Sequence, residues 1–132
     1  MTIDRAWPFQ QAVYQALAAA LPGVQGYAFV PPEPPAQYWR IDGWTVSPEQ
    51  AFKNRERAHH GVTVHLIELD TDSLQWVKQT LATAHAALNG LRLDANSAGL
   101  IMQTGDARLE PRADKVNDAH AFMRYTSAIE GT

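Results

Sequence analysis

Residues 60–90, HGVTVHLIELDTDSLQWVKQTLATAHAALNG, contain the two periodicities that decide the fold. In the first part, Val62, Val64 and Leu66 alternate with the side chains between them, as expected of a strand that buries one face. In the second part, apolar residues recur every three to four positions, which is the spacing of one helix face. This helical stripe comprises Leu74, Val77, Leu81, Ala84 and Leu88. The stretch therefore predicts a strand over His60–Leu69 and a helix over Ser73–Leu88.

The ends of this helix carry capping signals. Asp70 and Asp72 are N-cap candidates, and Gln75 follows Asp72 at the spacing of a capping box. The Asn-Gly pair at 89–90 predicts the C-terminal end, because both residues tolerate the left-handed conformation that closes many helices. Trp76 lies well outside the apolar stripe. We expect it to contact either another part of the chain or another subunit.

A second amphipathic helix is predicted over Pro8–Leu21. Pro8 suits the first helical turn, where its missing N–H would have no partner, and the Pro-Gly pair at 22–23 ends the helix. Its apolar face comprises Phe9, Val13, Ala16, Leu17, Ala20 and Leu21. We expect this face to pack on the core.

Further strands are expected on both sides of the opening stretch. Their ranges are Gln25–Val30, Tyr38–Val46, Leu91–Asp94, Leu100–Glu110 and His120–Ile129. Glycine inside a strand favours a bulge or a break, which we expect at Gly43 and Gly105. In the last strand, Phe122 should lie on one face. The opposite face should carry Met123, Tyr125 and Ile129.

The connections complete the predicted topology. Pro31–Pro35 is a stiff extended connector or a sheet edge, and we give less weight to a polyproline ligand for an SH3-like partner. The polar segment Ser47–His59 is predicted to be a long hairpin loop or arm, and Pro111–Asn117 a polar turn. The order is then α-β-β-β-α-β-β-β. It predicts one α+β domain over residues 1–132, with two helices packed on one face of a mostly antiparallel or mixed sheet of five to six strands.

Composition excludes several classes of function. A chain of 132 residues with 45% hydrophobic residues suits one globular domain. A net charge of −3 gives no general attraction to nucleic acid or anionic membrane, and the absence of cysteine excludes disulfides and thiolate chemistry. The first seven residues lack the apolar run of a signal peptide, and the longest apolar stretch, Ala16–Leu21, is too short for a membrane span. We therefore expect a soluble protein made in a cytoplasm.

The five histidines do not form a metal motif. His59 and His60 are adjacent, and His60 and His65 are an odd number of residues apart, so each pair should point to opposite faces of a strand. His85 lies at the edge of the helical stripe, where a packed or half-exposed imidazole is usual, and His120 is isolated in the sequence. No H-E-x-x-H pattern occurs. We expect no metal.

Catalytic and nucleic-acid motifs are also missing. The sequence has no G-x-S-x-G turn and no glycine-rich phosphate loop, and its serines fall in turns or caps. The one basic cluster, KNRER at 53–57, is short and contains a glutamate. We therefore expect no catalytic residue and no cofactor, and a protein that works by binding other proteins.

The order and spacing of the elements resemble those of the phage tail-completion or tail-terminator family, a group of head–tail joining proteins. The resemblance covers about Gln11 to Ile129 and lies in pattern, with no invariant chemical motif. The segments that carry it are AVYQALAAALPG (12–23), YAFVPPEPPAQYWRIDGW (27–44), HHGVTVHLIELD (59–70), SLQWVKQTLATAHAALNGLRL (73–93) and DAHAFMRYTSAI (118–129). One departure is the polar segment 47–60, which matches no family feature.

The resemblance implies a structural virion protein of a bacteriophage tail or neck, assembled in the host cytoplasm. Such a protein forms a homo-oligomeric ring, commonly a hexamer, on the last ring of the major tail-tube protein. The ring ends tube growth and presents a surface to the head–tail connector. DNA passes through its lumen without being read, and the family is non-enzymatic, with no catalytic residue to carry over.

On this basis we expect subunit or tube contacts at a sheet edge, at the 47–59 arm and around Trp76. The interface candidates are Trp76, Trp44, Lys53, Arg55 and Arg57. Two alternatives remain open. One is another phage neck or adaptor protein that binds its partner as a monomer, and the other is a small enzyme with a cryptic histidine-dependent site.

Overall fold

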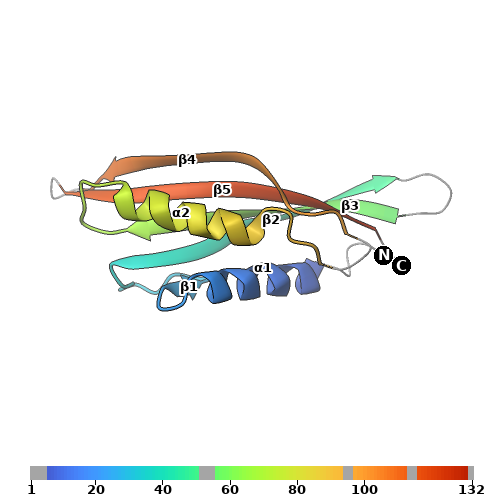
Figure 1. Cartoon of the computed structure of the whole chain (residues 1–132), viewed down its shortest axis with the longest axis horizontal. Coiled ribbons are helices and arrows are strands. Elements are labelled where there is room, and N and C mark those ends of the chain that lie inside the picture. The colour runs from blue at the N-terminus through green and yellow to red at the C-terminus, as the bar shows by residue number, and fades with distance from the viewer. Residues whose placement is uncertain (1–5, 51–55, 94–96, 113–115, 131–132) are drawn as a thin grey trace.

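The computed structural model describes residues 6–50, 56–93, 97–112 and 116–130. The elements are α1 (Ala6–Ala20), β1 (Gln25–Tyr27), β2 (Gln37–Gln50), β3 (Glu56–Glu68), α2 (Gln75–Leu88), β4 (Ile101–Pro111) and β5 (Asn117–Glu130). The strands form one sheet in the order β1-β2-β3-β5-β4, in which β1 and β2 are parallel and the other neighbours antiparallel. Both helices lie on the same face of this sheet (Figure 1). The predicted α+β fold is confirmed, with five strands.

The core fills the space between the helices and the sheet. In β3, Val62, Val64 and Leu66 are fully buried, and burying each such side chain contributes roughly 1.5–3 kcal/mol. Strand β5 repeats the alternation, with Phe122 facing away from the buried side as predicted. The buried residues of the two predicted helical stripes are Phe9, Val13, Leu17, Val77, Ala84 and Leu88. The two periodicities of the sequence therefore meet in a single core.

The predicted N-cap of α2 is wrong. The helix begins at Gln75 and its N-cap is Leu74, in place of Asp70 or Asp72. The Asp72 carboxylate accepts a hydrogen bond of 2.7 Å from the side-chain amide of Asn117, the first residue of β5. Asp70 has a positive φ of 56° in the turn before the helix. Both aspartates are thus engaged in the turn and its tertiary contact, which sequence spacing did not reveal.

After α2 the chain turns at the predicted position, with Asn89 as the C-cap and Gly90 at a φ of 80°. The strand predicted over Leu91–Asp94 is wrong in its described part, residues 91–93. The Gly90 N–H donates to the Leu100 carbonyl, and the Leu100 N–H donates to the Leu91 carbonyl, each at 2.9 Å. These bonds close a local loop instead of adding a strand to the sheet.

Of the two alternatives predicted for Ser47–His59, the loop is wrong and the arm agrees with the structure, because its described residues form paired strands. Ser47 pairs with His59, and the ladder continues to Gln50 and Glu56. Residues 51–55 lie outside the described part of the chain. In Figure 1 this end of the β2–β3 hairpin extends beyond both helices. The hydrogen bonds of a strand ladder join backbone groups and need no apolar face. A polar sequence can therefore form a hairpin where no helix covers the sheet.

The two expected strand irregularities have different outcomes. The register of β2 against β3 shifts between Asp42 and Thr45, and Gly43 has a φ of 63°, which confirms the bulge. In β4 the shift lies between Met102 and Thr104, before the predicted glycine at 105. The first predicted strand is shorter than expected and ends at residue 27.

Candidate functional site

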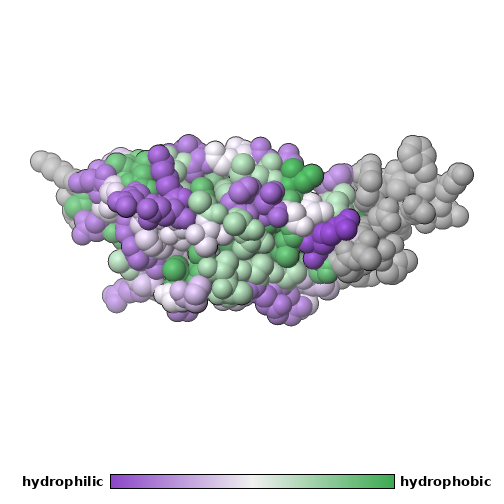
Figure 2. Space-filling view, in the orientation of Figure 1, coloured by the Kyte–Doolittle hydropathy of each residue, from purple (hydrophilic) through white to green (hydrophobic). Residues whose placement is uncertain are grey.

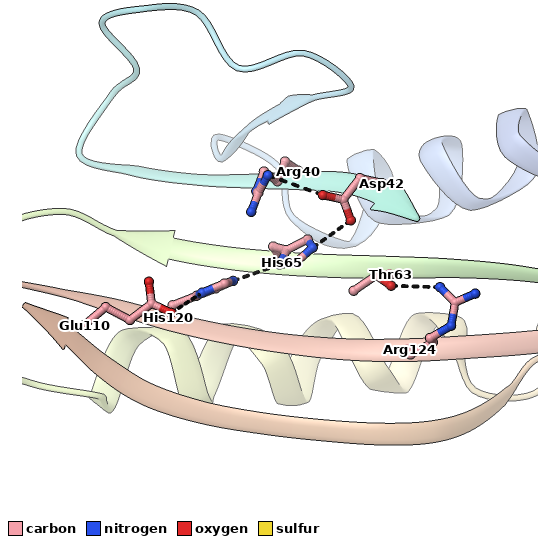
Figure 3. A network of polar contacts seen from close by, with 7 residues as sticks. All are labelled: Arg40, Asp42, Thr63, His65, Glu110, His120 and Arg124. Atoms are coloured by element: carbon pink, nitrogen blue, oxygen red, sulfur yellow. Dashed lines mark hydrogen bonds and ion pairs between the residues drawn. The ribbon is translucent and has the colours of Figure 1, made fainter. Parts of the chain in front are cut away.

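The sheet face turned away from the helices, which we call the open face, carries a row of polar side chains that crosses four strands. Arg40 and Asp42 come from β2, His65 from β3, His120 from β5 and Glu110 from β4 (Figure 3). Strand alternation places His65 and His120, since their neighbours along β3 and β5 point into the core. Strand register brings His65 and His120 together although they are 55 residues apart in the sequence.

These groups form a continuous chain of contacts. His65 Nε2 lies 2.8 Å from Asp42 Oδ1, and His65 Nδ1 lies 2.7 Å from His120 Nε2. His120 Nδ1 lies 2.9 Å from Glu110 Oε1, and Arg40 adds an ion pair of 3.3 Å to Asp42. The two imidazoles are 13% and 14% exposed, whereas both carboxylates are more than 40% exposed. The description of His120 as isolated is therefore wrong.

The chain of contacts constrains how many protons the two rings hold. Its three hydrogen bonds between ring nitrogens and their neighbours each need one N–H, because ionised carboxylates only accept. Two neutral imidazoles carry only two N–H groups, so neutral rings alone cannot make all three bonds at once. Burial, the largest cause, lowers the pKa of His65, and the hydrogen bond from His120 lowers the pKa of Glu110. The lowered pKa of His65 favours the neutral form of its ring.

We expect acid to destabilise the fold through this network. A His65 pKa below its unfolded value of about 6.5 means that the unfolded chain binds more protons as the pH falls below that value. The lowered pKa of Glu110 acts in the same direction below about 4.5. Urea unfolding at pH 7.5, 5.5 and 4.5 should show a smaller pH dependence for His65→Gln than for the native chain. The control Thr83→Gln, at an exposed and non-titrating position on α2, should keep the native dependence.

A second polar cluster on the open face holds the bulge of β2. Arg124 of β5 donates from Nη1 to the Gly43 carbonyl and to Thr63 Oγ1, both at 2.9 Å, and from Nη2 to Thr45 Oγ1 at 2.8 Å. Its guanidinium thus joins three strands. Gly61 must lack a side chain here, because a Cβ would lie 2.5 Å from both Arg124 Nη2 and the Thr45 hydroxyl.

The arrangement favours a structural role for the paired imidazoles. All four ring nitrogens of His65 and His120 contact Asp42, Glu110 or the other imidazole, and none of these partners is a serine or threonine hydroxyl that a base could activate. Among the described residues, no group of three histidines or acids could hold a metal ion. His60 lies on the other face of β3, as its spacing predicted, and is buried. His85 is half-buried and contacts the Tyr125 hydroxyl at 2.7 Å, as expected of a packed imidazole.

The exposed large apolar side chains of the described residues gather at two opposite edges of the sheet. Trp7 and Tyr14 are on α1, which lies beside β1 and β2, and Phe29 follows β1; we call this the α1 edge (Figure 1). The other three are on β4, at the far end of the strand order, and form the β4 edge. They are Ile101 (61% exposed), Met102 (43%) and Leu109 (37%). Trp7 and Phe29, at 65% and 92%, are the most exposed of all six.

A groove of about 380 Å³ runs along the α1 edge. It is lined by Trp7, Tyr14 and Trp44, by three glutamine side chains of α1, and by Ala28 and Ile41. Within the part of the chain that the structure describes, no charged residue is part of this lining. Strand β1 pairs with residues 38–40 of β2, so the outer edge of β2 beyond that point has no strand partner among the described residues.

The face covered by the helices differs from the two edges in how its hydrophobic residues are distributed. In Figure 2, strongly hydrophobic residues appear there as small separate patches between hydrophilic ones. Trp76 belongs to this layer, where it is half-buried and packs against the chain's own core. Trp44 is also half-buried, with its ring edge-to-face with Phe9 at 5.9 Å. An interface role for both stays a prediction.

Of the three charged interface candidates, Arg57 alone lies within the described residues. Lys53 and Arg55 lie outside the described residues. Arg57 is in β3, paired with Glu49 of β2 and Glu130 of β5 in the backbone register. The sequence did not single out Trp7, Phe29 or the apolar residues of β4. One signal was available for α1, since Tyr14 lies off its apolar stripe.

Comparisons with known proteins place the fold. No protein-family model matches the sequence, and no curated protein matches it. Among the described residues, no helix is long and apolar enough to cross a membrane. The structure is similar to a chain of the virion of a native gene transfer agent particle, with a TM-score of 0.71 and 24% sequence identity. The match covers 92% of this chain and 94% of that one. The chain thus shares its fold, along nearly its whole length, with a component of that particle.

Proposed function

We propose that the chain is a non-enzymatic structural protein of a phage-like virion that closes into a ring of identical copies. On the end of a tail tube, the ring stops tube growth and joins the tail to the head connector. The observation that carries this proposal is the pair of exposed apolar edges on opposite sides of one sheet. Apolar side chains left in water on a small chain mark protein contacts.

Two different surfaces on opposite sides favour a head-to-tail contact. When one copy's α1 edge meets the next copy's β4 edge, every interface is the same and each copy uses both surfaces. Such heterologous contacts close into rings if the rotation between copies closes. The likeness in fold to a virion component supports this placement. So does the resemblance of the sequence pattern to tail-terminator proteins.

Imaging of purified protein tests the proposal. We expect light scattering and negative-stain microscopy to reveal closed rings, of about six copies if the family resemblance holds, either alone or on tail tubes of the same particle. Tubes assembled with the protein should have a narrow length distribution and capped ends. A chain that stays monomeric alone and leaves tube ends bare would contradict the proposal. A monomer bound to a tube or connector would instead support the adaptor alternative.

A further inference from the structure

We propose that the groove of the α1 edge receives the first half of β4 from a second copy of the chain. Ile101 of one copy would then enter the groove beside Trp7, Tyr14 and Trp44 of the next, while Met102, on the opposite face of the strand, would stay outside it. The inference rests on the proposed ring and names the residues that form its contact. Nothing in the fold similarity or in the sequence pattern assigns this pairing.

The polarity of the groove and of the two halves of β4 indicates which segment occupies the groove. None of the described residues that line the groove is charged, so a charged segment seated among them would lose hydration without gaining a partner. The first five residues of β4, 101–105, are uncharged, whereas the second half contains Asp106, Arg108 and Glu110. The uncharged half also carries the two most exposed apolar side chains of the β4 edge. It therefore matches the groove in chemistry and the other half does not.

The contact has to form between copies. Four strand spacings of about 4.8 Å place the two edges of the sheet roughly 19 Å apart within one chain. The first half of β4 thus cannot reach its own groove. A second copy supplies it without any change in fold, and the second copy's groove remains free for a third.

Side chains, more than a continuous strand ladder, would make this contact. The register of β4 shifts between Met102 and Thr104, which interrupts the regular hydrogen-bonding pattern at the segment concerned. The groove offers aromatic rings for the apolar side chain that enters it and the amides of Gln10, Gln11 and Gln15 for backbone groups.

Cysteine cross-linking tests the pairing, because the native chain has no cysteine to interfere. Gln11→Cys, in the groove, and Gln103→Cys, two positions after Ile101, are made as separate variants carrying tags of different size. After mixing and mild oxidation, we expect the mixed dimer to be the main product. A matched control replaces Gln103→Cys by Thr83→Cys, at an exposed position on α2, and should give little mixed dimer. Each variant alone should also cross-link poorly.

A charge substitution tests which half of β4 enters the groove. Ile101→Glu should weaken assembly by about tenfold or more, equivalent to about 1.4 kcal/mol, because a carboxylate would enter an uncharged groove. Leu109→Glu is the comparison on the same strand, and it should weaken assembly clearly less than Ile101→Glu, because the second half of β4 does not enter the groove. Circular dichroism and thermal melting establish that both variants remain folded.

The outcomes separate the two proposals. Rings that form without the 11–103 cross-link, or that tolerate Ile101→Glu, would overturn the docking inference and leave the ring intact. Equal loss of assembly in Ile101→Glu and Leu109→Glu would also overturn it, because the two halves of β4 would then be equivalent. No rings from the native chain, with or without tail tubes, would instead refute the proposed function itself.

Discussion

Replacing Gly26 by alanine is expected to destabilise the folded chain by roughly 3 kcal/mol, at the upper end of what overpacking usually costs. A Cβ at this position would lie 2.0–2.4 Å from three ring atoms of the Trp39 indole. Trp39 is 1% exposed and is in ring contact with Tyr14, with the ring centroids 5.0 Å apart, so it cannot move aside freely. Urea unfolding followed by circular dichroism measures the loss.

A second substitution identifies the cause. The three atoms that the new methyl group meets all belong to the six-membered ring of the indole. In a Trp39→Phe background the smaller ring should leave space, so the additional cost of Gly26→Ala should fall clearly. This double-mutant cycle isolates the contact between the two positions. An equal cost of Gly26→Ala in both backgrounds would show that the strain lies in the β1 backbone.

Arg124→Ala is expected to cost about 3 kcal/mol, because hydrogen bonds to a charged group are worth about 1.5–3 kcal/mol and several are lost together. The substitution leaves the Gly43 carbonyl and the hydroxyls of Thr63 and Thr45 without their donor. Amide hydrogen exchange should also quicken around the β2 bulge, since the guanidinium joins that bulge to β3 and β5.

Two further variants make this prediction specific. Arg124→Lys should recover only part of the loss, because one ammonium cannot reproduce the forked geometry of a guanidinium. Arg92→Ala removes an arginine from an exposed position and should change stability by no more than about 0.5 kcal/mol. If Arg124→Ala behaves like Arg92→Ala, the bulge is stable without its bridging side chain.

The elements that sequence predicted well are those in which local periodicity and burial agree. The stripes of α1 and α2 and the alternation of β3 are local patterns, and the structure buries the expected residues. The prediction failed where tertiary context decides the local structure. Asp72 suits an N-cap but is bonded to Asn117, and the polar segment 47–59 suits a loop but forms a hairpin beyond the helices.

The site was harder to predict for the same reason. His65 and His120 both lie at outward positions of predicted strands, yet only the register of β3 against β5 places them side by side. The exposed apolar edges depend on the strand order, which periodicity cannot supply. The sequence singled out Trp76 because it lies outside the apolar stripe of its helix, although it packs against the core. Ile101 and Met102 have the pattern of ordinary strand residues, and only the strand order reveals that β4 is an uncovered edge.

The register shift in β4 has a consequence for how two copies of the chain would meet at high concentration. An uninterrupted edge strand offers the same backbone pattern to any other exposed strand, which is how sheets grow into fibres. Between Met102 and Thr104 that pattern is broken, so a passing strand finds no continuous template there. Recognition between copies would then depend on particular side chains of β4 and on the groove that receives them. In the proposed ring, copies of the chain would thus join in one orientation even at high concentration.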